Sequence, residues 1–123
     1  MNTQLLESTF YKNISKLFYA FMAIDKHVRR EEYRACMHQL KETWPEKEGA
    51  VSIEQQLKKL IVNKENAMHC FLNFESYYKS HHFLFSIEFK KSIKNTAGII
   101  ASAFGSKNKS ELILLAKLQL LMK

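Results

Sequence analysis

The side chains of this sequence that could ligate zinc or act as nucleophiles are five histidines and two cysteines. They are His27, His38, His69, His81, His82, Cys36 and Cys70. A zinc site usually contains a pair spaced as CxxC or HExxH, and none of these residues has such a spacing. Both cysteines lie among apolar neighbours, which is typical of reduced thiols in a core. We therefore expect neither a zinc site nor a disulfide.

The sequence also lacks the motifs of the common enzyme classes. It contains no GxSxG, no Walker sequence and no GxGxxG, and its three glycines leave little room for a phosphate-binding loop. An EF-hand beginning at Asp25 fails, because its third and fifth positions would be His27 and Arg29 and its twelfth would be Cys36. These absences predict a protein that is not an enzyme.

Positive charge is concentrated in the C-terminal part of the chain. Residues 1–75 contain 11 Lys or Arg against 10 Asp or Glu, whereas residues 76–123 contain 8 against 2. Lys90, Lys91 and Lys94 are the candidate anion-binding residues there. Arginine, the better reader of phosphates and guanine edges, does not occur in this part, so we expect contact with anionic lipid or nonspecific contact with nucleic acid. A solvated lysine-rich helix face is the alternative.

The elements that must position these side chains are helices. Glycine and proline are scarce, and residues that favour helices are plentiful. Apolar residues recur at every third or fourth position, which predicts helices over 4–24, 31–43, 53–63, 66–79, 83–104 and 111–122. Ser52 and Asn108 are the expected N-caps of the third and the last helix, and Gly105 the expected end of the fifth. We expect one all-α domain over residues 1–123, a bundle of about six helices.

No segment of the sequence is suited to cross a membrane. The most lipid-like window, residues 97–104, is far shorter than the roughly twenty residues that a spanning helix needs. The first residues do not show the basic and apolar pattern of a secretory signal. We expect a cytoplasmic protein with no transmembrane segment.

The junction between the first two predicted helices resembles that of a known family. Residues 23–32 read Ala-Ile-Asp-Lys-His-Val-Arg-Arg-Glu-Glu. They resemble the signature of the tellurite-resistance TerB-like family, in which a helix ends in Ala-Asp-Gly and is followed by an acidic residue, an aliphatic residue, a cap, a proline and two glutamates. Asp25, Val28, Glu31 and Glu32 match this pattern, whereas the glycine, acid, cap and proline positions hold Lys or His or Arg.

The junction before the last predicted helix looks like the second copy of the same signature. In residues 103–111, Ala103, Gly105, Asn108 and Glu111 match the pattern. Phe104 stands at the aspartate position, which departs from it. Two copies on separate helix junctions are in keeping with a duplicated helical bundle.

The resemblance implies an all-helical bundle and a carboxylate cluster that can hold a divalent cation. The candidate metal ligands are Asp25, Glu31 or Glu32, and Glu111. Hard cations prefer several oxygen ligands, and two helix ends that meet across a bundle can supply them. The basic residues around Asp25 and the phenylalanine at position 104 work against such a site. No other cofactor is implied.

Taken together, these patterns favour a non-catalytic binding or adaptor module that resembles TerB-like stress-response proteins and has a protein partner. Two alternatives stay open. One is a basic accessory module that contacts nucleic acid or an acidic membrane surface through its C-terminal half. The other is an interaction domain that forms a homodimer through the aromatic-rich segment 83–89, which offers more apolar surface than one helix face needs.

Overall fold

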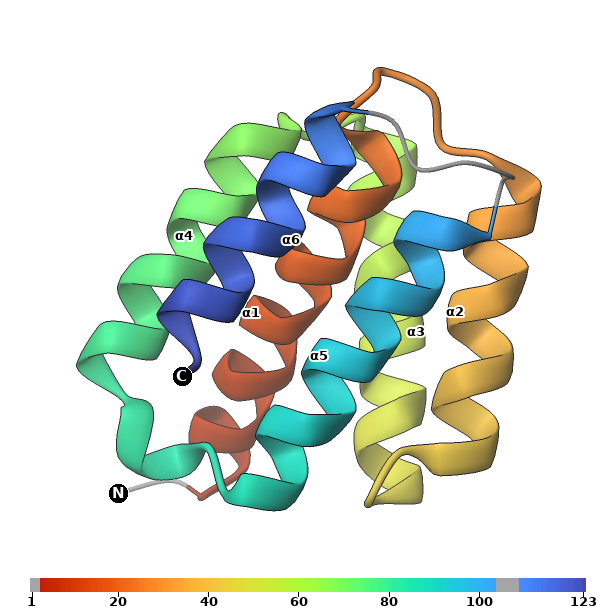
Figure 1. Ribbon diagram of the computed structural model, residues 1–123. Coiled ribbons are helices and arrows are strands. Elements are labelled where there is room, and N and C mark those ends of the chain that lie inside the picture. The colour runs from red at the N-terminus through yellow and green to blue at the C-terminus, as the bar shows by residue number, and fades with distance from the viewer. Residues whose placement is uncertain (1–2, 104–108) are drawn as a thin grey trace.

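In the residues that the computed structural model describes, 3–103 and 109–123, the chain forms six α-helices and one short 3-10 helix (Figure 1). They follow one another as α1 (Thr3–Ala23), α2 (Arg30–Thr43), α3 (Lys47–Asn63), α4 (Ala67–Ser80), η1 (His82–Leu84), α5 (Ile87–Ser102) and α6 (Lys109–Leu121). No strand occurs in these two ranges, so the predicted all-α bundle is confirmed. No helix in them combines the length and the apolar character that a bilayer span requires. The predicted roles of Phe104, Gly105 and Asn108 fall outside the described residues.

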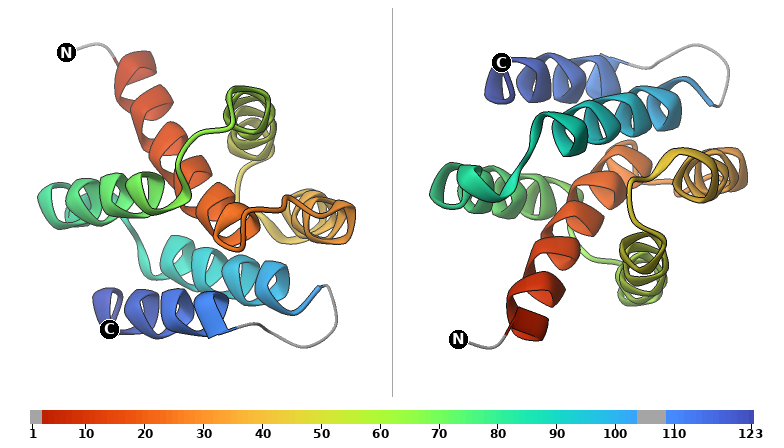
Figure 2. Two further views of the ribbon diagram at one scale, coloured as in Figure 1. Left: turned by 90° about the horizontal axis from the view of Figure 1, so that it is seen from above. Right: turned by 90° about the horizontal axis from the view of Figure 1, so that it is seen from below.

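Helix α1 lies at the centre of the bundle, and α3, α4 and α5 pack against it (Figure 2). Its predicted apolar stripe is buried from Phe10 to Met22. Neighbouring helices surround α1, so side chains outside that stripe are buried as well: Tyr11, Ser15, Tyr19 and Ala20. The buried hydroxyl of Ser15 donates a hydrogen bond of 2.7 Å to the carbonyl of Tyr11. Helix α1 therefore buries more of its surface than the apolar stripe alone.

The remaining helices lie on two sides of α1, and α5 and α6 form a layer outside it. Figure 2 shows α2 and α3 on one side of it and α4 on the other. Helix α5 packs on α1 and α2, and α6 packs on the outer side of α5 (Figure 2). Leu114 and Leu118 of α6 are buried, whereas Leu112, Ile113 and Leu120 are exposed. The last turn of α6 lies beside the first half of α5, as a 3.4 Å hydrogen bond from Lys94 Nζ to the carbonyl of Met122 shows.

Helix α3 begins earlier than the sequence predicts. Ser52, the expected N-cap, lies inside α3, which starts at Lys47 directly after the Pro45 turn. Gly49 lets this first part of α3 approach α1, since an added Cβ would lie 2.7 Å from ring atoms of Tyr11. The Tyr11 hydroxyl donates a hydrogen bond to Glu46, the residue that precedes α3. The start of α3 is thus set by its packing on α1, which the periodicity of α3 alone does not reveal.

Helix α5 begins later than predicted. The expected helix over 83–104 is divided, because η1 comes first and Ser86 then caps α5 by accepting a 3.1 Å hydrogen bond from the Phe89 N–H. Phe85 occupies the buried position of this segment. Ile87, an apolar residue inside the helix predicted over 83–104, is 85% exposed. The predicted start of this helix was wrong, because Phe85 of the connector fills the core position and the first residue of α5 lies outside the core.

Candidate functional site

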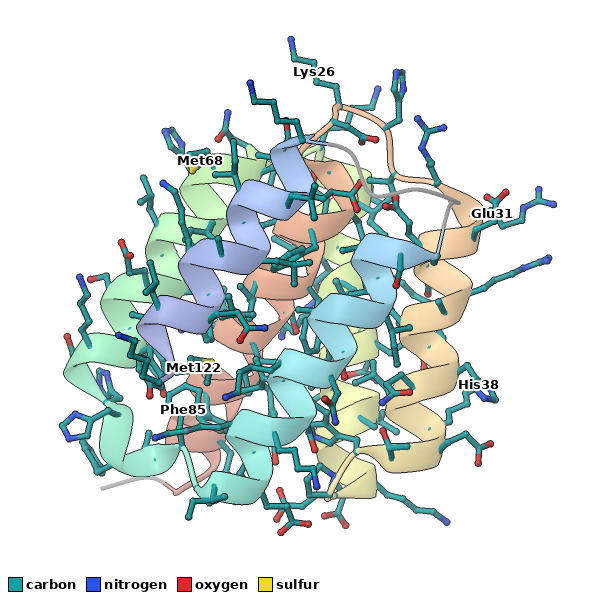
Figure 3. All side chains as sticks on the ribbon, in the orientation of Figure 1. Lys26, Glu31, His38, Met68, Phe85 and Met122 are labelled. Carbon is teal, nitrogen blue, oxygen red and sulfur yellow. The ribbon has the colours of Figure 1, made fainter. Side chains whose placement is uncertain are left out.

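Three of the four predicted metal ligands lie near one another around the first turn of α2. We call Asp25, Glu32 and Glu111 the acid junction. Glu32 is 1% exposed and Glu111, in the first turn of α6, is 4% exposed. Asp25 is half-buried between α1 and α2, where its carboxylate lies 3.6 Å from the guanidinium of Arg29 and accepts a 3.1 Å hydrogen bond from the His27 N–H. Glu31 is exposed and points away from the bundle (Figure 3).

Burial makes the charged form of Glu32 unfavourable. It raises the pKa of Glu32 from 4.5 to about 7, and the negative charge of Glu111 and, less strongly, of Asp25 adds to the increase. Two features of Arg29 oppose the increase: its N–H, which donates a 3.4 Å hydrogen bond to the Glu32 carboxylate, and its positive charge. Glu32 therefore exchanges a proton near neutral pH, and Glu111 is the carboxylate that most strongly influences it.

The acid junction does not assemble a dedicated cation site. In the described part of the chain, no group of three or more His, Cys, Asp or Glu side chains lies close enough together to hold a metal ion. Calcium and magnesium prefer six or more oxygen ligands, and Asp25 is already engaged by Arg29 and by the backbone. The residues present do not fit a divalent cation in this arrangement, and cation binding stays a prediction.

The three predicted anion-binding lysines are brought together in one groove. Together with residues of α6 they line a depression of about 500 Å³, which we call the lysine groove. Its lining is Ile87, Lys90, Lys91, Lys94, Asn95, Gln119, Met122 and Lys123. Helix periodicity placed the three lysines on α5, and the antiparallel packing of α6 adds Lys123 to them (Figure 1).

A second basic groove lies between α2 and α3, and sequence reasoning missed it. We call it the arginine groove; its volume is about 640 Å³ and its lining is Val28, Arg29, Arg30, Tyr33, Arg34, Lys58, Ile61 and Val62. The chain has only three arginines, and all of them line this groove. The signal was in the sequence, because the arginines occur only between positions 29 and 34, in the half of the chain whose net charge is nearly balanced.

The two cysteines are buried and unpaired, as predicted for core thiols. Burial raises the pKa of both thiols, so both stay protonated at neutral pH. Among the histidines, His81 stacks on the ring of Tyr77 with a centroid distance of 4.3 Å, and its Nδ1 lies 3.1 Å from the carbonyl of Tyr77. His81 therefore interacts with the last turn of α4, the helix that it follows.

Comparison with known proteins found no matching family model, no matching curated protein and no matching solved structure. The TerB-like resemblance consequently stays a prediction that depends on the two helix junctions. Lys26, in the connection between α1 and α2, has φ = 72°, in the left-handed region that favours glycine.

Proposed function

We propose that this chain is a non-catalytic binding module that holds an acidic, partly apolar segment of a partner protein in the arginine groove. The observation that carries the proposal is the mixture of side chains there, since the three arginines and Lys58 line the same groove as the apolar Val28, Ile61 and Val62. Val62 is 78% exposed, so an aliphatic side chain is accessible in a groove that four cationic side chains also line.

The charges around this groove favour an anionic partner. Two of the four cations have an acidic neighbour on their own helix or the preceding turn: Asp25 lies beside Arg29, and Glu54 lies 3.3 Å from Lys58. Arg30 and Arg34 are exposed and form no ion pair with any described residue. Two arginines are therefore available for carboxylates of a partner, and arginine binds a carboxylate through two parallel hydrogen bonds.

The residue types favour a protein over a nucleic acid. Arginine and tyrosine are enriched at the centres of protein interfaces, where an apolar floor is surrounded by a polar rim. The groove has this mixed composition, because Tyr33 and Val62 line it together with Arg30 and Arg34. An amphipathic helix or extended segment that alternates carboxylates and aliphatic side chains would complement it.

The TerB-like resemblance supplies the context of this proposal, namely a cytoplasmic module in a stress response such as tellurite resistance. Comparing the tellurite sensitivity of cells with and without the gene tests that context separately. Equal sensitivity would show that the proposed role in tellurite resistance is wrong. It would not bear on the binding of an acidic peptide, which needs its own test.

A displayed library of 16-residue random peptides tests the binding module directly. We expect selection on the wild-type protein to enrich peptides with several Asp or Glu and two or more aliphatic residues. The double variant Arg30→Glu/Arg34→Glu should weaken their binding at least tenfold, about 1.4 kcal/mol. Val62→Ser should also weaken peptide binding, because the groove loses apolar surface.

The matched control is Lys41→Glu/Lys47→Glu, which changes the net charge equally at exposed positions outside the groove. It should leave peptide binding nearly unchanged. If the enriched peptides lack acidic residues, or if both double variants weaken binding equally, the proposal of an acidic partner in this groove is wrong.

A further inference from the structure

Two bulky apolar side chains are strongly exposed at the junction of α4 and α5. Phe83, in η1, is 73% exposed, and Ile87, the first residue of α5, is 85% exposed. Ile87 itself lines the lysine groove. The end of the bundle where α4 runs into α5 (Figure 1) therefore presents large apolar side chains beside clustered positive charge.

The connector between α4 and α5, which contains Phe83, is held in the core by Phe85. Phe85, between them in sequence, is buried, and its ring centroid lies 4.9 Å from those of Phe10 in α1 and Tyr78 in α4 (Phe85 is labelled in Figure 3). Since Phe85 fills the core position, Phe83 and Ile87 stay outside it. Their exposure follows from the packing of the connector, so they are available without any rearrangement of the bundle.

The charge at this end of the bundle is strongly positive. Lys90, Lys91, Lys94 and Lys123 line the groove, and none of them forms an ion pair within the described part of the chain. The nearest acid in sequence is Glu88, an exposed residue in the first turn of α5. Four lysines against one glutamate leave an excess of positive charge directly beside Ile87.

We propose that this end of the bundle docks on an anionic lipid surface. Phe83 and Ile87 enter the boundary between headgroups and acyl chains, and the lysines contact the anionic headgroups. Peripheral membrane proteins bind by this combination of exposed apolar side chains and surrounding basic residues. A nucleic acid would satisfy the lysines equally, but its phosphate backbone offers no apolar medium for an aliphatic side chain such as Ile87. The proposal uses a surface different from the arginine groove and does not depend on it.

Co-sedimentation with lipid vesicles tests the docking surface. The purified chain is mixed with vesicles of phosphatidylcholine alone or with 30% phosphatidylserine, at low and at high salt. We expect binding to the anionic vesicles at low salt and much weaker binding to the neutral ones. Lys90→Gln/Lys91→Gln/Lys94→Gln should weaken binding about 100-fold, at about fivefold for each lysine. Phe83→Ser/Ile87→Ser should weaken it about tenfold and leave the salt dependence in place.

Two control variants separate an effect of the docking surface from an effect of net charge or of exposed apolar side chains elsewhere. Lys41→Gln/Lys47→Gln/Lys59→Gln removes the same charge from exposed positions of α2 and α3, and Val51→Ser removes an exposed aliphatic side chain of α3. Both controls should bind vesicles like the wild type. Equal weakening by the two lysine triples would overturn the proposal, because net charge alone would then explain binding.

The same variants distinguish a lipid surface from two other ligands of this end of the bundle, a nucleic acid and a second copy of the chain. If duplex DNA or RNA binds with the same lysine dependence and without dependence on Phe83 and Ile87, the surface is a nucleic-acid contact and the proposal is wrong. If the chain sediments at twice 14.5 kDa and Phe83→Ser/Ile87→Ser returns it to the monomer, a second copy covers the surface, which also overturns the proposal.

Discussion

Glu32 of α2 and Glu111 of α6 are both buried, and they lie close enough that the charge of Glu111 raises the pKa of Glu32. The folded protein therefore holds a proton on Glu32 up to about pH 7, whereas the unfolded chain loses it near pH 4.5. Stability should fall as the pH rises through this range, by up to about 3 kcal/mol at about 1.4 kcal/mol per pKa unit. Urea unfolding at pH 5 and pH 8 measures the difference. In Glu32→Gln, which cannot titrate, the difference should largely disappear; an unchanged difference would assign it to other groups.

The same residues decide whether a cation binds. We expect calcium, magnesium, manganese and zinc to leave the thermal midpoint of the chelator-treated protein unshifted at pH 8, where Glu32 is ionised, because Asp25 is already engaged by Arg29 and the His27 N–H and the two glutamates alone supply too few ligands. A cation that binds only the folded state would add about 2.7 kcal/mol at a hundred times its Kd. A rise in the midpoint that is lost in Asp25→Asn and Glu111→Gln would contradict this expectation and place the ion at the acid junction.

The glycines at positions 49 and 98 should respond oppositely to alanine. Gly49→Ala places a Cβ 2.7 Å from ring atoms of Tyr11, so α3 or the ring must shift, at about 1 to 3 kcal/mol. Gly98 is also helical, but nothing lies within 4 Å of an added Cβ, so Gly98→Ala should stabilise the protein by about 0.5 to 1 kcal/mol. Equilibrium unfolding of both variants measures the contrast. Equal effects would mean that the contact between α3 and Tyr11 is not as close as described.

Replacing Lys26 or Lys64 by glycine should stabilise the protein. Both have positive φ, 72° and 51°, which costs a residue with a Cβ about 1 kcal/mol. Lys26→Gly and Lys64→Gly should therefore each raise the free energy of unfolding by a few tenths to about 1 kcal/mol, the unfolded chain's extra freedom offsetting part of the gain. A loss of stability in Lys26→Gly would show that the aliphatic part of this lysine packs on the surface. Lys59→Gly, inside α3, is the control and should destabilise.

Local patterns predicted the helices whose ends are marked by strong local signals. The second helix ends at Thr43 as predicted, directly before Trp44 and Pro45. Asn66, which the prediction placed inside the fourth helix, is instead the N-cap of α4 and accepts a hydrogen bond from the His69 N–H. Where tertiary contacts set the boundary, prediction failed. Nothing in the residues around Ser52 shows that Gly49 will pack against Tyr11, and nothing around Ile87 shows that Phe85 will fill the core instead.

The candidate sites were predictable only in part, for a related reason. Neighbouring residues on a helix point about 100° apart, so one of Glu31 and Glu32 had to face outward, and only the packing of α6 decides that Glu32 faces in. The three lysines share one helix and were found from the excess of positive charge in the C-terminal part of the chain. The arginine groove needs Lys58 and Val62 of α3 beside Tyr33 of α2, a neighbourhood that no single-helix pattern contains.

The central place of α1 also bears on how the chain reaches its fold. During synthesis α1 emerges before every helix that covers it, and its neighbour α4 lies more than forty residues further along the chain. Until α4 and α5 have left the ribosome, the aromatic side chains of α1 have no permanent cover, and they are the surface that a nascent-chain chaperone would recognise. The bundle closes late for a helical protein, since the contacts that bury α1 join distant parts of the chain.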